Sequence, residues 1–201
     1  MDRSLSEVDT EIINHVESLG GSVEYSDHYF DVSLGSLHVS AADLRPLRKL
    51  QRPFTLGLLE SRYDNSDLRE LLAFPQLTAV ILTYSTVTDA GVQELAAHKT
   101  LKSLDLSGTK ITDVSLARLA KMPALESLNL CATAITDAGL TELLASPTLT
   151  GLGLAQTTIS DQSLPVLMKS PRLKSLNLQD TRMTDEARSK LRRSLPECRI
   201  Y

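Results

Sequence analysis

The sequence predicts an α/β solenoid, a stack of similar coils that each contain one strand and one short helix. Leucines recur at fixed places in five consecutive blocks of 24 residues, which begin at Leu77, Leu101, Leu125, Leu149 and Leu173. Within a block, apolar residues first alternate with polar ones, as in a strand, and then recur three residues apart, as on one helix face. A period of this length predicts stacked repeats in a single domain.

Composition limits the classes of function. The 201 residues carry 21 Lys and Arg against 25 Asp and Glu, which does not favour binding to nucleic acid or to an anionic membrane. The N-terminal residues lack the apolar core of a signal peptide, and no apolar run approaches a membrane span. We therefore expect a cytoplasmic monomer whose two distant cysteines, Cys131 and Cys198, are free thiols.

Residues 1–28 are expected to form an N-terminal cap made of a helix and a strand. Apolar residues recur at helical spacing at Leu5, Val8, Ile12, Val16 and Leu19. Ser4 and Glu7 have the spacing of a capping box, and the letters SVEY at 22–25 are a strand candidate. Because a solenoid leaves its first apolar layer open, the simplest role of this helix is to cover that layer. The alternative is a helix that docks a partner.

Seven repeats are expected over 29–196. Counting back from Leu77 in steps of 24 gives Pro53 and Tyr29, with apolar residues in the expected places, so the first two repeats are degenerate. The last repeat has Arg188 where the others have an aliphatic residue, as expected for a cap that faces water. Residues 197–201 are expected to add a C-terminal edge strand.

Two polar columns recur at the turns of the repeats. A Thr-Asp pair such as Thr112-Asp113 precedes the helix, where its side chains can accept the free N–H groups of the first turn. The ninth position, counted from the first leucine of each block, holds Ser85, Thr109, Thr133, Thr157 and Thr181. We expect these residues to form a hydroxyl ladder between neighbouring coils, because the turn is inside the stack and its backbone groups cannot reach water.

The blocks LKSLDLSGTKITDVSLARLA and LESLNLCATAITDAGLTELL resemble the leucine-rich repeats of bacterial and cysteine-containing type. The resemblance covers about 168 of the 201 residues. It implies a right-handed, curved solenoid with a concave parallel sheet, convex short helices and a surface that binds other macromolecules. The motif is specific for the fold and says little about the partner.

The side chains expected to point outward from the concave sheet are small and neutral for the most part. Leu59, Ile81 and the neighbouring Tyr84 form an expected exposed apolar group, and such groups often anchor protein interfaces. We rank this group first as a contact site. The alternative is that the first two irregular repeats cover these side chains.

A second candidate contact site lies further along the same face. Gly151 and Gly153 occupy outward places on one strand, where glycine allows the close approach of a ligand or of another backbone. The expected walls of this shallow hollow are Asn129, Cys131, Asn177 and Gln179, and Asp105 points outward on the strand before them. The alternative is a surface without a function.

No catalytic or metal site is predicted. His15, His28, His38 and His98 lack metal-ligand spacing, and no nucleophile-elbow, zinc-protease or phosphate-loop motif occurs. Cys131 could be a reactive thiol, but no neighbouring base or cation is evident.

We therefore expect a non-enzymatic module, without cofactor or metal, that binds an unidentified protein partner on its concave sheet. The alternative is a regulatory or inhibitory subunit of an enzyme complex, including a ubiquitin-ligase-like substrate adaptor that lacks an F-box of its own.

Overall fold

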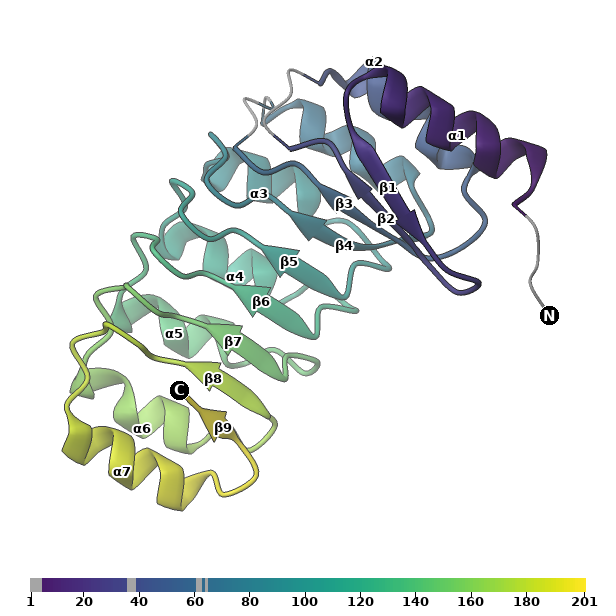
Figure 1. Ribbon diagram of the computed structural model, residues 1–201. Coiled ribbons are helices and arrows are strands. Elements are labelled where there is room, and N and C mark those ends of the chain that lie inside the picture. Colours follow the sequence, from purple (N-terminus) through teal and green to yellow (C-terminus); the bar gives the residue numbers. More distant parts are fainter. Residues whose placement is uncertain (1–4, 36–38, 61–62, 64) are drawn as a thin grey trace.

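The computed structural model describes residues 5–35, 39–60, 63 and 65–201. These residues form an arc in which one sheet follows the inner side and the helices follow the outer side (Figure 1). The strands lie side by side in chain order and the sheet stays open. They are β1 (Ser22–Tyr25), β2 (Phe30–Ser33), β3 (Phe54–Gly57), β4 (Leu77–Ile81), β5 (Ser103–Asp105), β6 (Ser127–Asn129), β7 (Gly151–Gly153), β8 (Ser175–Asn177) and β9 (Arg199–Ile200).

The register of the sheet follows the sequence period. β1 pairs antiparallel with β2, and every later pair is parallel. Leu104 lies beside Leu128, which lies beside Leu152, so equivalent residues of successive coils are neighbours across the sheet. This stacking confirms the predicted α/β solenoid.

Helix α1 precedes the first coil, and one or two shorter helices return the chain across the outer side in each coil. They are α1 (Glu7–Ser18), α2 (Ala41–Leu44), η1 (Arg45–Lys49), η2 (Asp67–Ala73), α3 (Asp89–Leu95), η3 (Asp113–Ser115), α4 (Leu116–Leu119), α5 (Asp137–Leu143), η4 (Asp161–Ser163), α6 (Leu164–Met168) and α7 (Asp185–Ser194). The elements labelled η are 3-10 helices. These tight turns fit the few residues available between the strand and the next coil.

The core is a continuous column of aliphatic side chains between the sheet and the helices. Leu104 of β5, Leu106 directly after it, and the helix residues Leu116 and Leu119 are all at most 1% exposed. Each additional coil buries the same set against its neighbours, so stability is shared along the stack.

Helix α1 begins two residues later than the capping box expected from the sequence. Ser6 is the N-cap, and its hydroxyl accepts a hydrogen bond from the Asp9 N–H while the Asp9 carboxylate accepts one from the Ser6 N–H. Ser4, the predicted cap, lies outside the described residues. Ile12 and Val16 of this helix are 1% exposed, so its apolar face is buried against the first coils.

The hydroxyl column bonds within each coil, and the predicted ladder between coils is wrong. The Oγ1 atoms of Thr109 and Thr157 donate to the carbonyl oxygen three residues earlier, each at 2.6 Å. Thr133 and Thr181 make the same bond. Ser85, which is 4% exposed, is the exception in the column, because its Oγ has no hydrogen-bond partner among the described residues.

The aspartate column supplies the links between coils. Asp89 accepts hydrogen bonds from the N–H (3.0 Å) and the hydroxyl (2.8 Å) of Thr112 in the next coil. The Thr112 hydroxyl in turn accepts a hydrogen bond from the Val114 N–H. The threonine therefore caps the helix of its own coil, and the aspartate binds the threonine of the next coil. Asp113, Asp137 and Asp161 repeat the forward link to Thr136, Ser160 and Thr184.

One of these carboxylates shows the electrostatic consequence of the link. Burial alone would raise the pKa of Asp137, but hydrogen bonds from Ser160 and Ser163 outweigh burial and hold the pKa below its ordinary value.

The eighth position has left-handed backbone in the six coils from residue 53 onward. It is occupied by Glu60, Tyr84, Ala132, Gln156 and Asp180, with φ between 53° and 58°, and by Gly108 at 66°. This conformation turns the N–H toward the next coil, where Tyr84 donates to the Ser107 carbonyl at 2.8 Å and Ala132 to that of Ala155 at 2.8 Å. The backbone strain is therefore offset by hydrogen bonds that continue the sheet ladder past the ends of the strands.

Candidate functional site

The structure brings half of the predicted contact residues into one row across the sheet. Ile81, Asp105, Asn129, Gly153 and Asn177 are successive partners in the register of β4 to β8. Because the residues between them in each strand point into the core, these side chains lie on the face opposite the helices. Gly151 lies in the adjacent row, and Leu59, Cys131 and Gln179 follow the ends of their strands.

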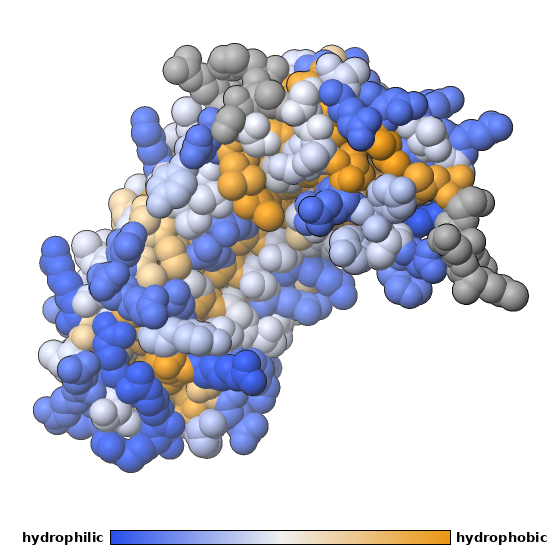
Figure 2. All heavy atoms as spheres, in the orientation of Figure 1, coloured by the Kyte–Doolittle hydropathy of each residue, from blue (hydrophilic) through white to orange (hydrophobic). Residues whose placement is uncertain are grey.

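The predicted apolar group is exposed in part. Tyr84 is 63% exposed and Leu59 is 38% exposed, whereas Ile81 is half-buried. Leu59 packs beside Gly57, and the Tyr84 ring lies over Gly108 of the next coil, where a Cβ atom would come within 2.3 Å of it. Figure 2 shows hydrophobic side chains at the surface around β3 and β4, while hydrophilic ones dominate around α7.

The polar residues of the row are engaged in a network of their own. The Asp105 carboxylate accepts hydrogen bonds from the N–H (2.8 Å) and hydroxyl (2.6 Å) of Ser107 and from Asn129 Nδ2 (2.8 Å). Asn129 Oδ1 accepts the N–H of Cys131 in the same way. These side chains satisfy strand-end N–H groups, which the sequence pattern alone did not reveal.

The hollow at the glycine strand is present and is partly filled. Its volume is about 220 Å³, and its lining includes Ser127, Asn129, Cys131, Gly153 and Asn177 but not Gln179. A Cβ atom on Gly153 would meet Asn129 Oδ1 at 2.5 Å, so the asparagine side chain lies across the glycine. Glycine is therefore required at position 153 by the structure itself, because it leaves space for the Asn129 amide that binds Asp105.

Free hydrogen-bonding groups remain at the C-terminal half of the face. Asn177 accepts the N–H of Gln179 through Oδ1, and its Nδ2 has no partner among the residues that the structure describes. The side-chain amide of Gln179, which is exposed, also has no partner there. These amides are available to a polar partner.

Comparison with known proteins identifies the repeat. Residues 99–143 match a family model described as leucine-rich repeats in two copies, and residues 169–191 match one described as a leucine-rich repeat. The coils of this chain are leucine-rich repeats. No curated protein sequence matched it.

Two solved structures share this fold. An internalin C2 from Listeria monocytogenes superimposes with a TM-score of 0.58 at 22% identity, over 94% of this chain and 80% of that one. The internalin inlF from the same organism gives a TM-score of 0.53 at 19% identity, over 85% of this chain and 52% of that one. At these identities the likeness concerns the fold.

Cys131, the thiol on the sheet face, is not activated as a nucleophile. Burial raises the pKa of the Cys131 thiol, and the charge of Asp105 raises it further, so the uncharged thiol is favoured over the nucleophilic thiolate. The described residues contain no group of three His, Cys, Asp or Glu side chains placed to hold a metal ion. His38, one of the four histidines, lies outside them.

No helix within the described part is long and apolar enough to cross a membrane.

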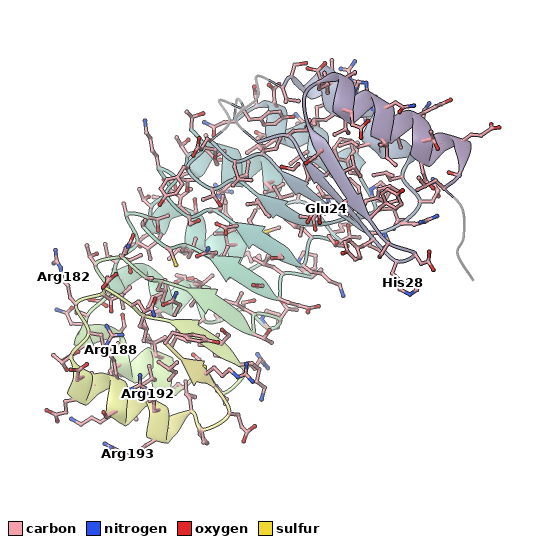
Figure 3. All side chains as sticks on the ribbon, in the orientation of Figure 1. Glu24, His28, Arg182, Arg188, Arg192 and Arg193 are labelled. Atoms are coloured by element: carbon pink, nitrogen blue, oxygen red, sulfur yellow. The ribbon has the colours of Figure 1, made fainter. Side chains whose placement is uncertain are left out.

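The two ends of the arc differ in charge (Figure 3). Glu24 and His28 belong to the β1–β2 hairpin, and Arg182, Arg188, Arg192 and Arg193 gather around α7. Antiparallel pairing places Glu24 opposite Asp31, and burial together with the Glu24 charge raises the pKa of Asp31. The sequence did not indicate this acidic pair, because the pairing of the two short strands could not be read from the period.

The basic cluster in the first repeat is used inside the protein. Arg48 contacts Glu70 at 2.5 Å, Lys49 contacts Glu11 at 3.6 Å, and Arg52 contacts the buried Asp9 at 3.5 Å. Arg52 also donates to the Ser26 carbonyl at 3.3 Å and lies over the Phe30 ring. This cluster ties α1 and the first hairpin to the repeats.

Proposed function

We propose that this chain is a non-enzymatic protein-binding module whose partner contacts the inner sheet face. The leucine-rich repeats and the absence of an activated nucleophile or metal cluster in the described residues favour an interaction module over an enzyme.

One observation carries the choice of surface. Leu59, Ile81 and Tyr84 leave apolar area exposed on a face whose remaining residues are small and polar. Aromatic and aliphatic anchors surrounded by polar residues are typical of interface hot spots. Tyr84 adds a hydroxyl that has no hydrogen-bond partner among the described residues and is free to bind a partner.

The contact is expected to extend from this apolar group toward β8. Asn177 and Gln179 carry the free amides, and the small residues between them and Ile81 allow another chain to approach the sheet closely. A partner would then bury an apolar anchor at one end and exchange hydrogen bonds at the other.

The test uses substitutions that the fold already accommodates elsewhere. Tyr84→Asp places aspartate where Asp180 adopts the same left-handed backbone, and Ile81→Asn places asparagine where Asn129 lies in the same row. Both variants are therefore expected to keep the unfolding transition of the wild type.

The assay is cross-linking followed by pull-down from native lysate, with Val114→Asp as the matched control. Val114 is 69% exposed and apolar but belongs to η3 on the outer side. Partner recovery should fall at least about tenfold for the double Ile81/Tyr84 variant, as expected for the loss of one hot-spot anchor, and should persist for the control. Equal recovery by both would show that the sheet face is not the binding surface.

A further inference from the structure

One column of the repeat loses its large side chains toward the C-terminal end. The twenty-second position of the 24-residue unit, shortly after the outer helix, holds Leu50, Phe74, His98 and Met122 in the earlier coils, and each is at most 3% exposed. The next two coils hold Ser146 and Ser170 at this position.

The backbone of the column does not change with the side chain. The N–H of Phe74, Met122, Ser146 and Ser170 donates in every case to the carbonyl three residues earlier, at 3.0–3.2 Å. The two serines therefore stand where the other coils place a bulky group, and the space that such a group would fill is left open.

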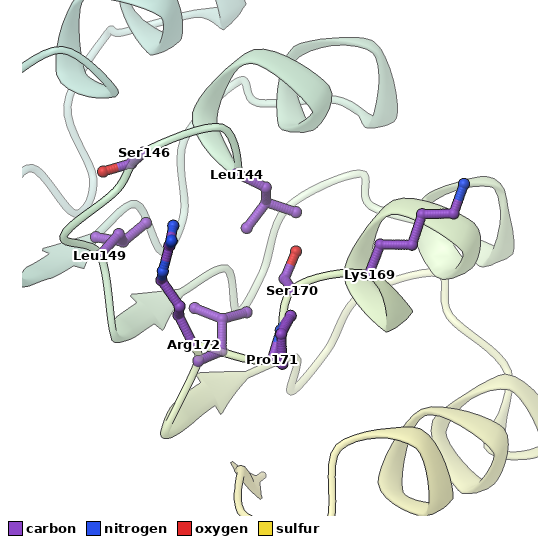
Figure 4. A pocket seen from close by; sticks show the side chains of 8 residues that line it. Leu144, Ser146, Leu149, Lys169, Ser170, Pro171 and Arg172 are labelled. Atoms are coloured by element: carbon purple, nitrogen blue, oxygen red, sulfur yellow. The ribbon is translucent and has the colours of Figure 1, made fainter.

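A pocket of about 290 Å³ occupies this space between the ends of α5 and α6 and the starts of β7 and β8 (Figure 4). Its walls combine aliphatic residues with the two serines and two cations. The lining residues are Leu144, Ser146, Leu149, Lys169, Ser170, Pro171, Arg172 and Leu173. The volume is at the lower end of the range for ligand pockets, roughly 300–1,000 Å³, so it suits a small molecule.

The polar groups of the pocket favour an anion. No carboxylate lines it, and neither Lys169 nor Arg172 has a side-chain hydrogen bond or ion pair within the part of the chain that the structure describes. In Figure 4 the two cations flank the pocket, with Leu144, Ser170 and Pro171 between them. The Ser146 hydroxyl, in a residue that is 5% exposed, makes only 3.4 Å contacts with Thr148, so it can still donate to a ligand.

In a neighbouring groove, positive and negative side chains are present in equal number. A pocket of about 350 Å³ lies between the equivalent ends of α4 and α5, where Met122 fills the column. Its lining includes Lys121 and Glu142, so one cation is accompanied by one carboxylate. The excess positive charge therefore distinguishes the Ser146 pocket from this groove.

We propose that the Ser146 pocket binds a small amphipathic monoanion of the aliphatic carboxylate class. The apolar tail lies against Leu144, Leu149 and Leu173, and the carboxylate accepts hydrogen bonds from Arg172 and Ser146. This site is made by the loops between the outer helices and the strands, shares no residue with the proposed partner surface and does not depend on it.

The test is an NMR titration of the ¹⁵N-labelled full chain with sodium hexanoate, with 1-hexanol and hexylammonium chloride at equal ionic strength as comparison ligands. Hexanoate should shift the amide signals of 144–149 and 169–173 saturably. Hexanol should bind about tenfold more weakly, because it lacks the charge-assisted bonds. Hexylammonium should give no saturable shift in these segments.

Three variants identify the groups responsible. Arg172→Gln should reduce hexanoate affinity to that of hexanol, whereas Lys121→Gln, beside the balanced groove, should leave it unchanged. Ser146→Met should abolish binding of both ligands by restoring the side chain found at Met122, and its unfolding transition verifies the fold.

If hexanol binds as tightly as hexanoate, or if Arg172→Gln leaves hexanoate affinity unchanged, the proposal is overturned, because the pocket then binds through apolar contacts alone. A titration without saturable hexanoate shifts would overturn it as well.

Discussion

Removing one buried hydroxyl should have opposite effects in two equivalent coils. Thr109 Oγ1 donates to the Leu106 carbonyl at 2.6 Å, while Ser85 Oγ, at the same position in an earlier coil, has no partner in the described structure. Thr109→Val removes the hydroxyl and keeps the shape of the side chain. Ser85→Ala removes the hydroxyl that is buried without a hydrogen bond.

The expected magnitudes follow from these contacts. Loss of one intramolecular hydrogen bond destabilises a protein by about 1 kcal/mol, so Thr109→Val should lower the free energy of unfolding by about that amount. A buried hydroxyl without a partner is unfavourable by about 1–3 kcal/mol, so Ser85→Ala should leave stability unchanged or raise it by about 1 kcal/mol. For a chain of this size, 1 kcal/mol shifts Tm by about 2–4 °C.

Urea unfolding followed by circular dichroism measures both changes in free energy, and thermal unfolding provides the second reading. Thr109→Ser is the control, since it keeps the hydroxyl and removes only a methyl group. If Ser85→Ala proves as destabilising as Thr109→Val, the Ser85 hydroxyl is hydrogen-bonded in solution and the distinction between the two coils is refuted.

Three further predictions concern other parts of the stack. Gly108→Ala should destabilise the fold by about 1–2 kcal/mol, because residue 108 has a φ of 66° and the new Cβ atom meets the Tyr84 ring. Adding Tyr84→Ala should restore the part of this stability loss that is due to the ring. If the effects of the two substitutions on the free energy of unfolding in urea are strictly additive, the contact is contradicted. Burial lowers the pKa of His98, so the wild type should lose stability as the pH falls below about 6.5, where the unfolded histidine takes up a proton that the folded one resists. His98→Met should remove this part of the pH dependence of Tm, and an unchanged profile would show that His98 is not its source. Arg52→Ala should destabilise the N-terminal cap by about 1–3 kcal/mol, because it leaves buried Asp9 without its cation. Lys49→Ala removes one partner of an exposed ion pair and should change stability by less than about 0.5 kcal/mol. Hydrogen exchange of the α1 amides compares the two variants, and equal protection of these amides in both would refute the role of Arg52.

The 24-residue period predicted the fold because the spacing of the leucines shows directly which side chains are buried. The leucines at the fourth and sixth positions can be inside only if the coils stack in register, and Leu104, Leu128 and Leu152 do so. The same argument placed Ile81, Asp105, Asn129, Gly153 and Asn177 on one face. Strand alternation is therefore sufficient to predict which residues share a face.

Hydrogen-bond partners could not be predicted in the same way. A threonine at the ninth position can donate to its own coil or to the next, and only the geometry of the turn decides that Thr109 donates to Leu106. The reach of Asp89 to Thr112, 23 residues away, is likewise set by the height of one coil. The composition of the glycine strand suggested an open hollow, but the Asn129 side chain occupies part of it.

Because the aspartate links between coils recur at the same offset in successive repeats, the array can change length by recombination in whole units. Deletion of residues 101–124 would place Leu125 directly after Thr100 and bring Asp89 to Thr136, the equivalent of its present partner Thr112. The bond from Ser115 to Asp89 would be lost, since Gly139 would take the place of that serine. The bonds from Ser107 to Thr83 and from Asn129 to Asp105 on the inner face would be lost as well. Duplication or loss of one such unit would therefore alter the span of the inner surface while preserving the joints that hold it.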